Sequence, residues 1–226
     1  MWNRIFNPEN IIFQVTDRLF NIVLLSVLWL FLCIPVVTAG PATAALYYAL
    51  VKCIRRREPM PFKNYFQSFR ANFKDGLLTG LICLVAGQIL AMGFFLLLPS
   101  ALAGTKRGML VFGVYCVFLL LVMGIMAYLF PLLSRYAMGT GRLFGTAVRL
   151  GLKHLPSTLL LAVLMVLGVV LCIEFWLLLP VMPSLVGLLA SGPLERIFKR
   201  YTAAEAEGER EEEAEDGERE KPWYLR

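Results

Sequence analysis

Long stretches without charged residues decide what this chain can fold into. Four such windows contain 18, 23, 25 and 24 residues, and the fourth carries a single acid. At 1.5 Å per helical residue each covers roughly 27 to 37 Å, enough to cross a hydrocarbon core of about 30 Å. With 58% hydrophobic and 17% charged residues, the composition excludes an ordinary soluble domain and predicts an integral membrane protein. The windows are residues 20–37, 77–99, 109–133 and 156–179.

Two shorter apolar windows, residues 42–54 and 181–194, each follow a proline-marked break and end in basic residues. If both cross the membrane, 16 of the 18 Lys and Arg residues in 1–201 lie on one side, and only Lys106 and Arg107 on the other. This agrees with the positive-inside rule. We therefore expect an all-α polytopic membrane bundle of about six transmembrane helices, four long and two short. They would form three hairpins with interfacial inner helices, and both termini would be cytoplasmic.

The stretch "PVVTAGP" interrupts the first of these hairpins. It could kink one span, form a re-entrant loop at a binding site, or be the tip of a hairpin of two spans. The charge distribution favours a tip at or just beneath the outer surface. We predict a close-packed elbow and not a substrate site, because proline stops helices, glycine permits unusual backbone angles, and the following alanines keep the next helix slim. The elbow motif comprises Pro35, Thr38, Gly40, Pro41 and Thr43.

The connection "PFKNYFQSFRANFKDG" has five aromatic residues at i, i+3, i+4, i+7 and i+11, which is one narrow helical face. Basic residues border this face. The pattern fits an interfacial helix with rings among acyl chains and cations at anionic headgroups. The alternative is a docking surface for a partner, with the rings setting position and Arg70 and Asn72 giving specificity. The docking candidates are Phe66, Phe69, Arg70, Asn72, Phe73 and, from the next inner connection, Arg135.

In that next connection, Arg135, Arg142 and Arg149 are spaced by seven residues, and Lys153 lies eighteen beyond Arg135. On a continuous helix all four would share one stripe, although four glycines weaken such a helix. The same two interpretations apply here: anchoring at the membrane surface, or docking of a cytoplasmic partner.

The motifs "IPVVTAGPATAALYYALVK", "FKNYFQSFRANFKDG", "FPLLSRY" and "ERIFKRY" resemble the YesL-like family of bacterial membrane proteins, over about residues 3 to 201. The family has no assigned activity. Its members are linked to carbohydrate uptake beside ABC-type oligosaccharide importers, so the resemblance implies an accessory role in glycan import at the bacterial cytoplasmic membrane. The matching positions are Pro35, Thr38, Gly40, Pro41, Thr43, Ala44, Phe66, Phe69, Asn72, Phe73, Pro131, Leu132 and Arg135.

Signatures of catalysis are nearly absent. The chain has no Walker A sequence and no importer-type ATPase-docking loop between spans. His154 is the single histidine, and the five cysteines lie in apolar segments without CxxC spacing. Metal sites, a Ser/His/Asp triad and disulfides therefore have no support. We expect a non-enzymatic protein without metal or cofactor.

Two polar residues stand out within the long windows. Glu174 lies six residues before Pro180, and Gln88 lies midway along the second window. A carboxylate in hydrocarbon is expensive and marks a functional candidate. The alternative is a Glu near enough to the surface to reach water, or one that is held protonated. Gln88 is the most plausible polar partner for Glu174 within the bundle.

The last 25 residues differ sharply from the rest. Residues 202–226 hold 10 acidic and 4 basic residues, whereas residues 1–201 hold 6 acidic and 18 basic ones. Such a segment cannot bury a core, so we expect a disordered tail or a fraying helix. The predicted organisation is one transmembrane domain, 1–201, and an acidic tail, 202–226.

Two function classes remain open from the sequence. One is an accessory or regulatory component of sugar import, with anionic lipid and importer permease or ATPase subunits as partners and no nucleic acid. The other is an autonomous small-solute transporter or channel with a pathway near Thr38, Gln88 and Glu174. A pathway needs several polar groups at membrane depth, and their scarcity favours the accessory class.

Overall fold

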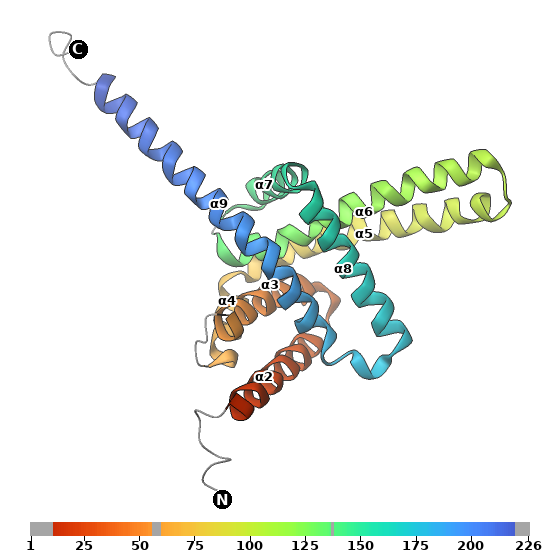
Figure 1. Cartoon of the computed structure of the whole chain (residues 1–226), viewed down its shortest axis with the longest axis horizontal. Coiled ribbons are helices and arrows are strands. Elements are labelled where there is room, and N and C mark those ends of the chain that lie inside the picture. Colours follow the sequence, from red (N-terminus) through yellow and green to blue (C-terminus); the bar gives the residue numbers. More distant parts are fainter. Residues whose placement is uncertain (1–10, 56–59, 137, 220–226) are drawn as a thin grey trace, which may run out of the picture. The chain divides into compact units, whose positions relative to one another are not determined.

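A computed structural model describes residues 11–55, 60–136 and 138–219, and every element in these ranges is a helix (Figure 1). The predicted all-helical fold is confirmed. The helices are α2 (Ile11–Leu32), α3 (Ala39–Ala49), α4 (Pro61–Ala71), α5 (Phe73–Leu102), α6 (Lys106–Arg135), α7 (Thr140–Lys153), α8 (Leu155–Glu174) and α9 (Met182–Arg219). Two 3-10 turns, η1 (Val36–Thr38) and η3 (Trp176–Leu178), and one π-helical segment, η2 (Leu50–Arg55), complete the list.

Four helical stretches in the described chain are long and apolar enough to cross a membrane, as expected for a helical membrane bundle. Three of them correspond to the second, third and fourth apolar windows. The other is Val36–Ile54, which is longer than predicted because η1, α3 and η2 follow one another without a break. The first window gives only a shorter apolar helix, Arg18–Leu32. The window at 181–194 belongs to α9, which begins at Met182 and runs on into the charged tail.

Helix α3 lies at the centre of the packing and contacts α2, α4, α5 and α6. Its small residues make this possible, because Ala42, Ala44, Ala45 and Ala49 are all fully buried. Small side chains let helix backbones approach closely without a large loss of contact area. The adjoining apolar cluster unites α2, α3, η2 and α4 through Leu25, Ala45, Leu46, Ala49, Leu50 and Tyr65.

Helix α4 runs back along α3, which differs from the predicted interfacial connection. The Asn64 amide lies 3.4 Å from Cys53 Sγ near the end of α3 and η2, and the Tyr65 hydroxyl reaches the Ala42 carbonyl. At the start of α5, Gly76 touches Pro41. From the start of α4 to the start of α5, the residues contacted in η2 and α3 therefore have progressively lower residue numbers. Helices α3 and α4 are consequently antiparallel. The beginning of α5 consequently lies beside the elbow and not at the opposite end of α3.

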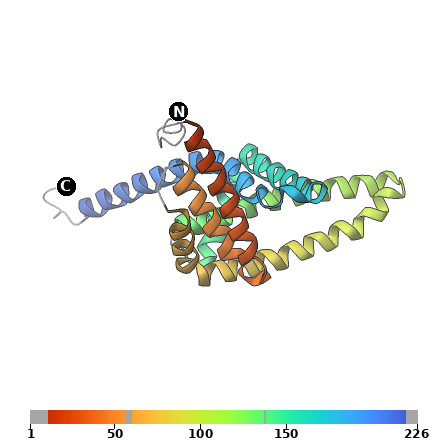
Figure 2. The same cartoon turned by 90° about the horizontal axis from the view of Figure 1, so that it is seen from below.

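Helices α5 and α6 form a long hairpin, which extends to the right in both cartoon views (Figures 1 and 2). The Tyr115 hydroxyl donates to the Leu90 carbonyl at 2.6 Å, over Gly93, which leaves room for the ring. Phe94 and Phe112 pack with ring centroids 5.3 Å apart. The most apolar stretch of α5 has no residue buried within the described chain, and that of α6 has few. Such an apolar surface suits contact with lipid.

Helix α8 packs on α6 through a polar contact. Gly124 of α6 leaves space for Thr158, whose buried hydroxyl donates to the Gly151 carbonyl at 2.7 Å and lies 3.3 Å from the Tyr128 hydroxyl. At the start of α9, Ser184 lies 2.7 Å from Ser26 of α2, and the Ser184 amide donates to the same hydroxyl. Ser26 thereby satisfies one of the free amides at the N-terminus of α9.

The chain divides into two compact units, Met1–Ser191 and Gly192–Arg226, so the boundary lies ten residues before the predicted one at 201. In the second unit α9 continues as a helix to Arg219. Of the two forms expected for this segment, a disordered tail or a fraying helix, the described part has the helical one. The reason is composition, because Glu, Ala and Arg all have high helix propensity. The prediction for residues 220–226 lies outside the described residues.

Candidate functional site

The junction between α4 and α5 holds most of the predicted docking residues. Helix α4 ends at Ala71, Asn72 caps it with φ −100° and ψ 15°, and α5 begins at Phe73. The Asn72 side-chain amide donates to the Ser68 carbonyl at 3.0 Å and lies 3.2 Å from the Ser68 hydroxyl. Asn72 was expected to give specificity toward a partner. Its amide is engaged within the turn and so helps to shape the junction, while its role toward a partner stays a prediction.

The aromatic residues of α4 do not form one lipid-facing stripe. Asn64, Tyr65 and Ser68 are buried against the rest of the bundle, and Phe69 packs on the apolar cluster around α3. The Tyr65 hydroxyl donates to the Ala42 carbonyl at 3.2 Å. Burial raises the pKa of the Tyr65 phenol, so this donor keeps its proton. The prediction that Tyr65 inserts among acyl chains is therefore wrong.

The remaining aromatic and basic residues stay exposed at this junction. Phe66 is 40% and Phe73 38% exposed, and Arg70 and Lys74 are exposed as well. We call these four residues the junction surface. Phe73 still contacts the bundle side of the junction, with its ring centroid 5.6 Å from that of Phe69.

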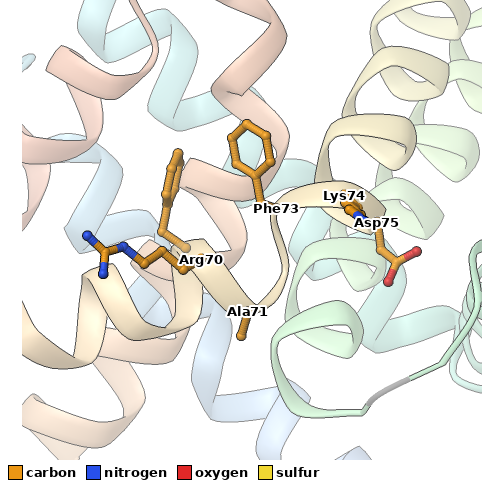
Figure 3. Close-up of a pocket in the computed structure, with 6 residues that line it drawn as sticks. Arg70, Ala71, Phe73, Lys74 and Asp75 are labelled. Atoms are coloured by element: carbon orange, nitrogen blue, oxygen red, sulfur yellow. The ribbon is translucent and has the colours of Figure 1, made fainter.

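A hollow of about 510 Å³ lies within the junction. Figure 3 shows Arg70 on one side of it and Lys74 and Asp75 on the other, with Phe73 between them. Two cations, two aromatic rings and a single carboxylate line the hollow. Such a site suits an apolar group that carries a negative charge, since Arg and Lys supply charge-assisted hydrogen bonds and the rings supply contact area. The hollow is lined by Phe69, Arg70, Ala71, Phe73, Lys74 and Asp75.

Arg135 belongs to a different element from the basic residues that follow it. It is the last residue of α6, is exposed, and lies over the Tyr136 ring at 5.9 Å. Helix α7 begins only at Thr140. The predicted stripe of four basic residues is thus wrong for Arg135, because the helix is interrupted before α7. The antiparallel α5–α6 hairpin does bring Arg135 to the end where α5 begins.

The hydroxyl groups of the elbow motif are engaged within the protein. Thr38 donates to the carbonyls of Leu32 and Pro35, and Thr43 donates to the Ala39 carbonyl at 2.7 Å. The Trp29 indole donates to Thr43 at 3.1 Å. These contacts hold the end of α2 to the start of α3.

Gly40 and Pro41 of the elbow motif are buried against α5, whereas Pro35 is exposed. A Cβ on Gly40 would overlap the Gly76 carbonyl oxygen and lie 2.8 Å from the Gly80 Cα. A Cβ on Gly76 would lie 2.9 Å from the Pro41 Cα. Two backbones meet here at a distance that only glycine permits. The part played by Gly76 and Gly80 was missed from sequence, although their spacing of four in an apolar helix is a recognised signal of close helix packing.

The two polar candidates of the long windows do not form a buried pair. Gln88 lies on the exposed side of α5. Helix α8 ends at Glu174 and not at Pro180, so the carboxylate lies at an exposed helix end. The sequence placed Glu174 inside a span because apolar residues continue to Leu179, but the chain turns into η3 instead.

A buried polar group not predicted from the sequence lies between Gly76 and Gly80 of α5. Thr79 is fully buried, and its hydroxyl has no hydrogen-bond partner among the described residues. No disulfide joins the five cysteines. Within the described chain, no three His, Cys, Asp or Glu residues gather in a way that could hold a metal ion.

Residues 22–94, about a third of the chain, match the family described as protein of unknown function, DUF624. The matched segment runs from α2 into α5 and includes both the elbow motif and the α4–α5 junction. Searches among curated proteins and among solved structures found no match.

Proposed function

We propose that this protein is a non-enzymatic component of the bacterial cytoplasmic membrane that docks a subunit of an ABC-type oligosaccharide importer. The DUF624 match is associated with YesL-like membrane proteins, and the resemblance of the motifs to that family links the chain to glycan import. The match includes the junction surface. The match and the resemblance support an accessory or regulatory role.

The observation that carries this proposal is the junction surface itself. Tyr65, Ser68 and Phe69 of α4 are used in packing, yet Phe66 and Phe73 remain exposed beside Arg70 and Lys74. Exposed aromatic and Arg residues around a hollow are typical of protein interaction sites. The matching partner segment would carry an acidic side chain among apolar ones.

A solute pathway receives less support. The Thr38 and Thr43 hydroxyls are engaged by carbonyls of the same chain, and Gln88 and Glu174 are exposed on different elements. A pathway requires several polar groups that face a common space, which these four do not provide.

The test is co-purification of importer subunits with the tagged full-length chain from membranes of its own host. The double variant Arg70→Gln with Lys74→Gln should lose at least tenfold of the captured partner, because each lost charge-assisted contact weakens binding by about tenfold. The matched control is Lys106→Gln with Arg107→Gln, which removes the same charge at the other end of the hairpin. If both double variants captured the same amount of importer subunits, docking at the junction surface would be contradicted.

A growth assay on an oligosaccharide distinguishes the accessory class from the transporter class. The junction variant should slow growth only when the importer is the sole uptake route. Uptake by the purified protein alone, reconstituted in vesicles, would instead establish an autonomous transporter.

A further inference from the structure

Helix α7 has one face that packs on the bundle. Five residues of this face are buried, and α7 contacts α6 and α8. Gly151 marks the closest approach, where an added Cβ would lie 2.7 Å from Ile125 of α6. The orientation of α7 is therefore fixed by packing. The buried residues are Leu143, Thr146, Ala147, Leu150 and Gly151.

The opposite side of α7 is exposed and divides into two sectors. Val148 and Leu152, 41% and 51% exposed, lie one turn apart. Leu155, also 51% exposed, lies at the start of α8 just after α7 ends. Exposed Arg142, Arg149 and Lys153 follow at i, i+7 and i+11, which places them on one line about 100° around the helix from the apolar sector.

The position of α7 along the chain limits what can cover this side. It connects α6 to α8, two helices that are long and apolar enough to cross a membrane. Arg135 closes α6, and Leu155 opens α8 two residues after Lys153. A helix between two such spans lies where they leave the hydrocarbon core. Its exposed side consequently meets the headgroup region.

We propose that the exposed side of α7 binds an anionic bilayer surface. Val148, Leu152 and Leu155 would enter the acyl boundary, and Arg142, Arg149 and Lys153 would contact headgroup phosphates. Charge decides the occupant, because α7 carries three cations and no carboxylate. Anionic lipids of the cytoplasmic leaflet supply the complementary charge. This surface is separate from the junction surface and does not depend on the proposed docking function.

The first experiment measures lipid-dependent stability of the full-length protein in a neutral detergent. Phosphatidylglycerol should raise the melting temperature more than phosphatidylcholine does. The triple variant Arg142→Gln, Arg149→Gln and Lys153→Gln should raise the phosphatidylglycerol concentration needed for half of this shift at least tenfold, since each cation near the surface contributes about fivefold in affinity. The control triple variant Lys63→Gln, Lys106→Gln and Arg107→Gln should raise this phosphatidylglycerol concentration less. If the triple variant of α7 needed the same phosphatidylglycerol concentration as the unchanged protein, the proposal would be overturned.

The second experiment identifies the occupant directly and uses a chain that keeps all its charges. A photoreactive benzoylphenylalanine in place of Leu152 should add the mass of one phospholipid on irradiation of native membranes. The same group in place of buried Leu150 should cross-link within the chain. A cross-link from position 152 to another protein would assign this face to a protein partner and overturn the lipid proposal. It would leave the junction surface and its own test unaffected.

Discussion

Gly40 is the residue at which a single methyl group should matter most. Gly40→Ala places a Cβ on the Gly76 carbonyl oxygen, and a backbone atom within a helix cannot move aside as a flexible side chain can. We expect a loss of about 2 kcal/mol of stability, within the range for overpacked sites. The measurement is the melting temperature in mild detergent.

Gly87→Ala is the matched control for Gly40→Ala, because Gly87 also lies in a helix but has open space where a Cβ would be added. It should keep or slightly raise stability, since Ala favours helix more than Gly does. Equal stability of the two variants would mean that the close approach at Gly40 is absent from the folded protein. A Gly40 variant with full stability and selective loss of solute uptake would favour a substrate site over an elbow.

Thr79 and Thr158 are both buried but differ in their hydrogen bonds. The Thr158 hydroxyl donates to the Gly151 carbonyl, whereas the Thr79 hydroxyl has no partner in the described chain. Thr158→Val should cost about 1 kcal/mol because it removes a hydrogen bond and leaves buried acceptors behind. Thr79→Val should be neutral or stabilising, since it removes only an unpaired group. Thermal unfolding of the pair tests this, and a clear loss at Thr79 would reveal a partner for its hydroxyl.

At the scale of elements, the α5–α6 hairpin depends on Tyr115 lying over Gly93. Gly93→Leu would push the Tyr115 ring away and break its bond to the Leu90 carbonyl. We expect faster amide hydrogen exchange around residues 90–94 and 112–116, because the helices lose this hydrogen bond and the ring contact over Gly93. Gly113→Leu, at a position with open space, is the control. Equal exchange in both variants would contradict a locked hairpin.

Sequence periodicity predicted where helices occur better than which of their faces are buried. The apolar windows identified α5, α6 and α8, because a span needs length and low charge, and both can be read directly. The aromatic positions of α4 gave the correct helix but assigned Tyr65 to lipid. Tyr65 is buried because the small residues of α3 leave space for its ring and the Ala42 carbonyl accepts its hydrogen bond. A helical pattern alone cannot distinguish lipid from a neighbouring helix as the environment of an apolar face.

For the whole molecule, the arrangement of α3, α4 and α5 is what the sequence could not supply. Charge counting placed the elbow on the outer side and the α4–α5 junction on the inner side. The structure joins them, because Gly40 packs on Gly76 and Gly80 near the start of α5. The cause is a long-range contact between glycines that are separated by 36 and 40 residues. Neither the hydropathy pattern nor the charge distribution predicts that contact.

This contact predicts that the elbow and the start of α5 face the same side of the membrane. Cys33 lies between α2 and η1, two residues before Pro35 of the elbow motif, and is a natural reporter. In a variant whose four other cysteines are serine, a membrane-impermeant maleimide should label Cys33 from the side that labels an added Lys74→Cys. A Lys106→Cys reporter at the far end of the hairpin should be labelled from the opposite side.

The pH dependence of this labelling identifies the reacting thiol. Burial raises the pKa of Cys33 to about 11, and the thiolate is the form that reacts with maleimide. The labelling rate of Cys33 should therefore rise about tenfold per pH unit from pH 7 to 10, since the thiolate fraction grows in proportion below the pKa. An exposed cysteine at position 74 should level off near pH 9, because its thiol has an ordinary pKa of about 8.5. Labelling of Cys33 from the side that labels position 106 would contradict the Gly40–Gly76 contact and restore the hairpin that crosses the membrane at α3.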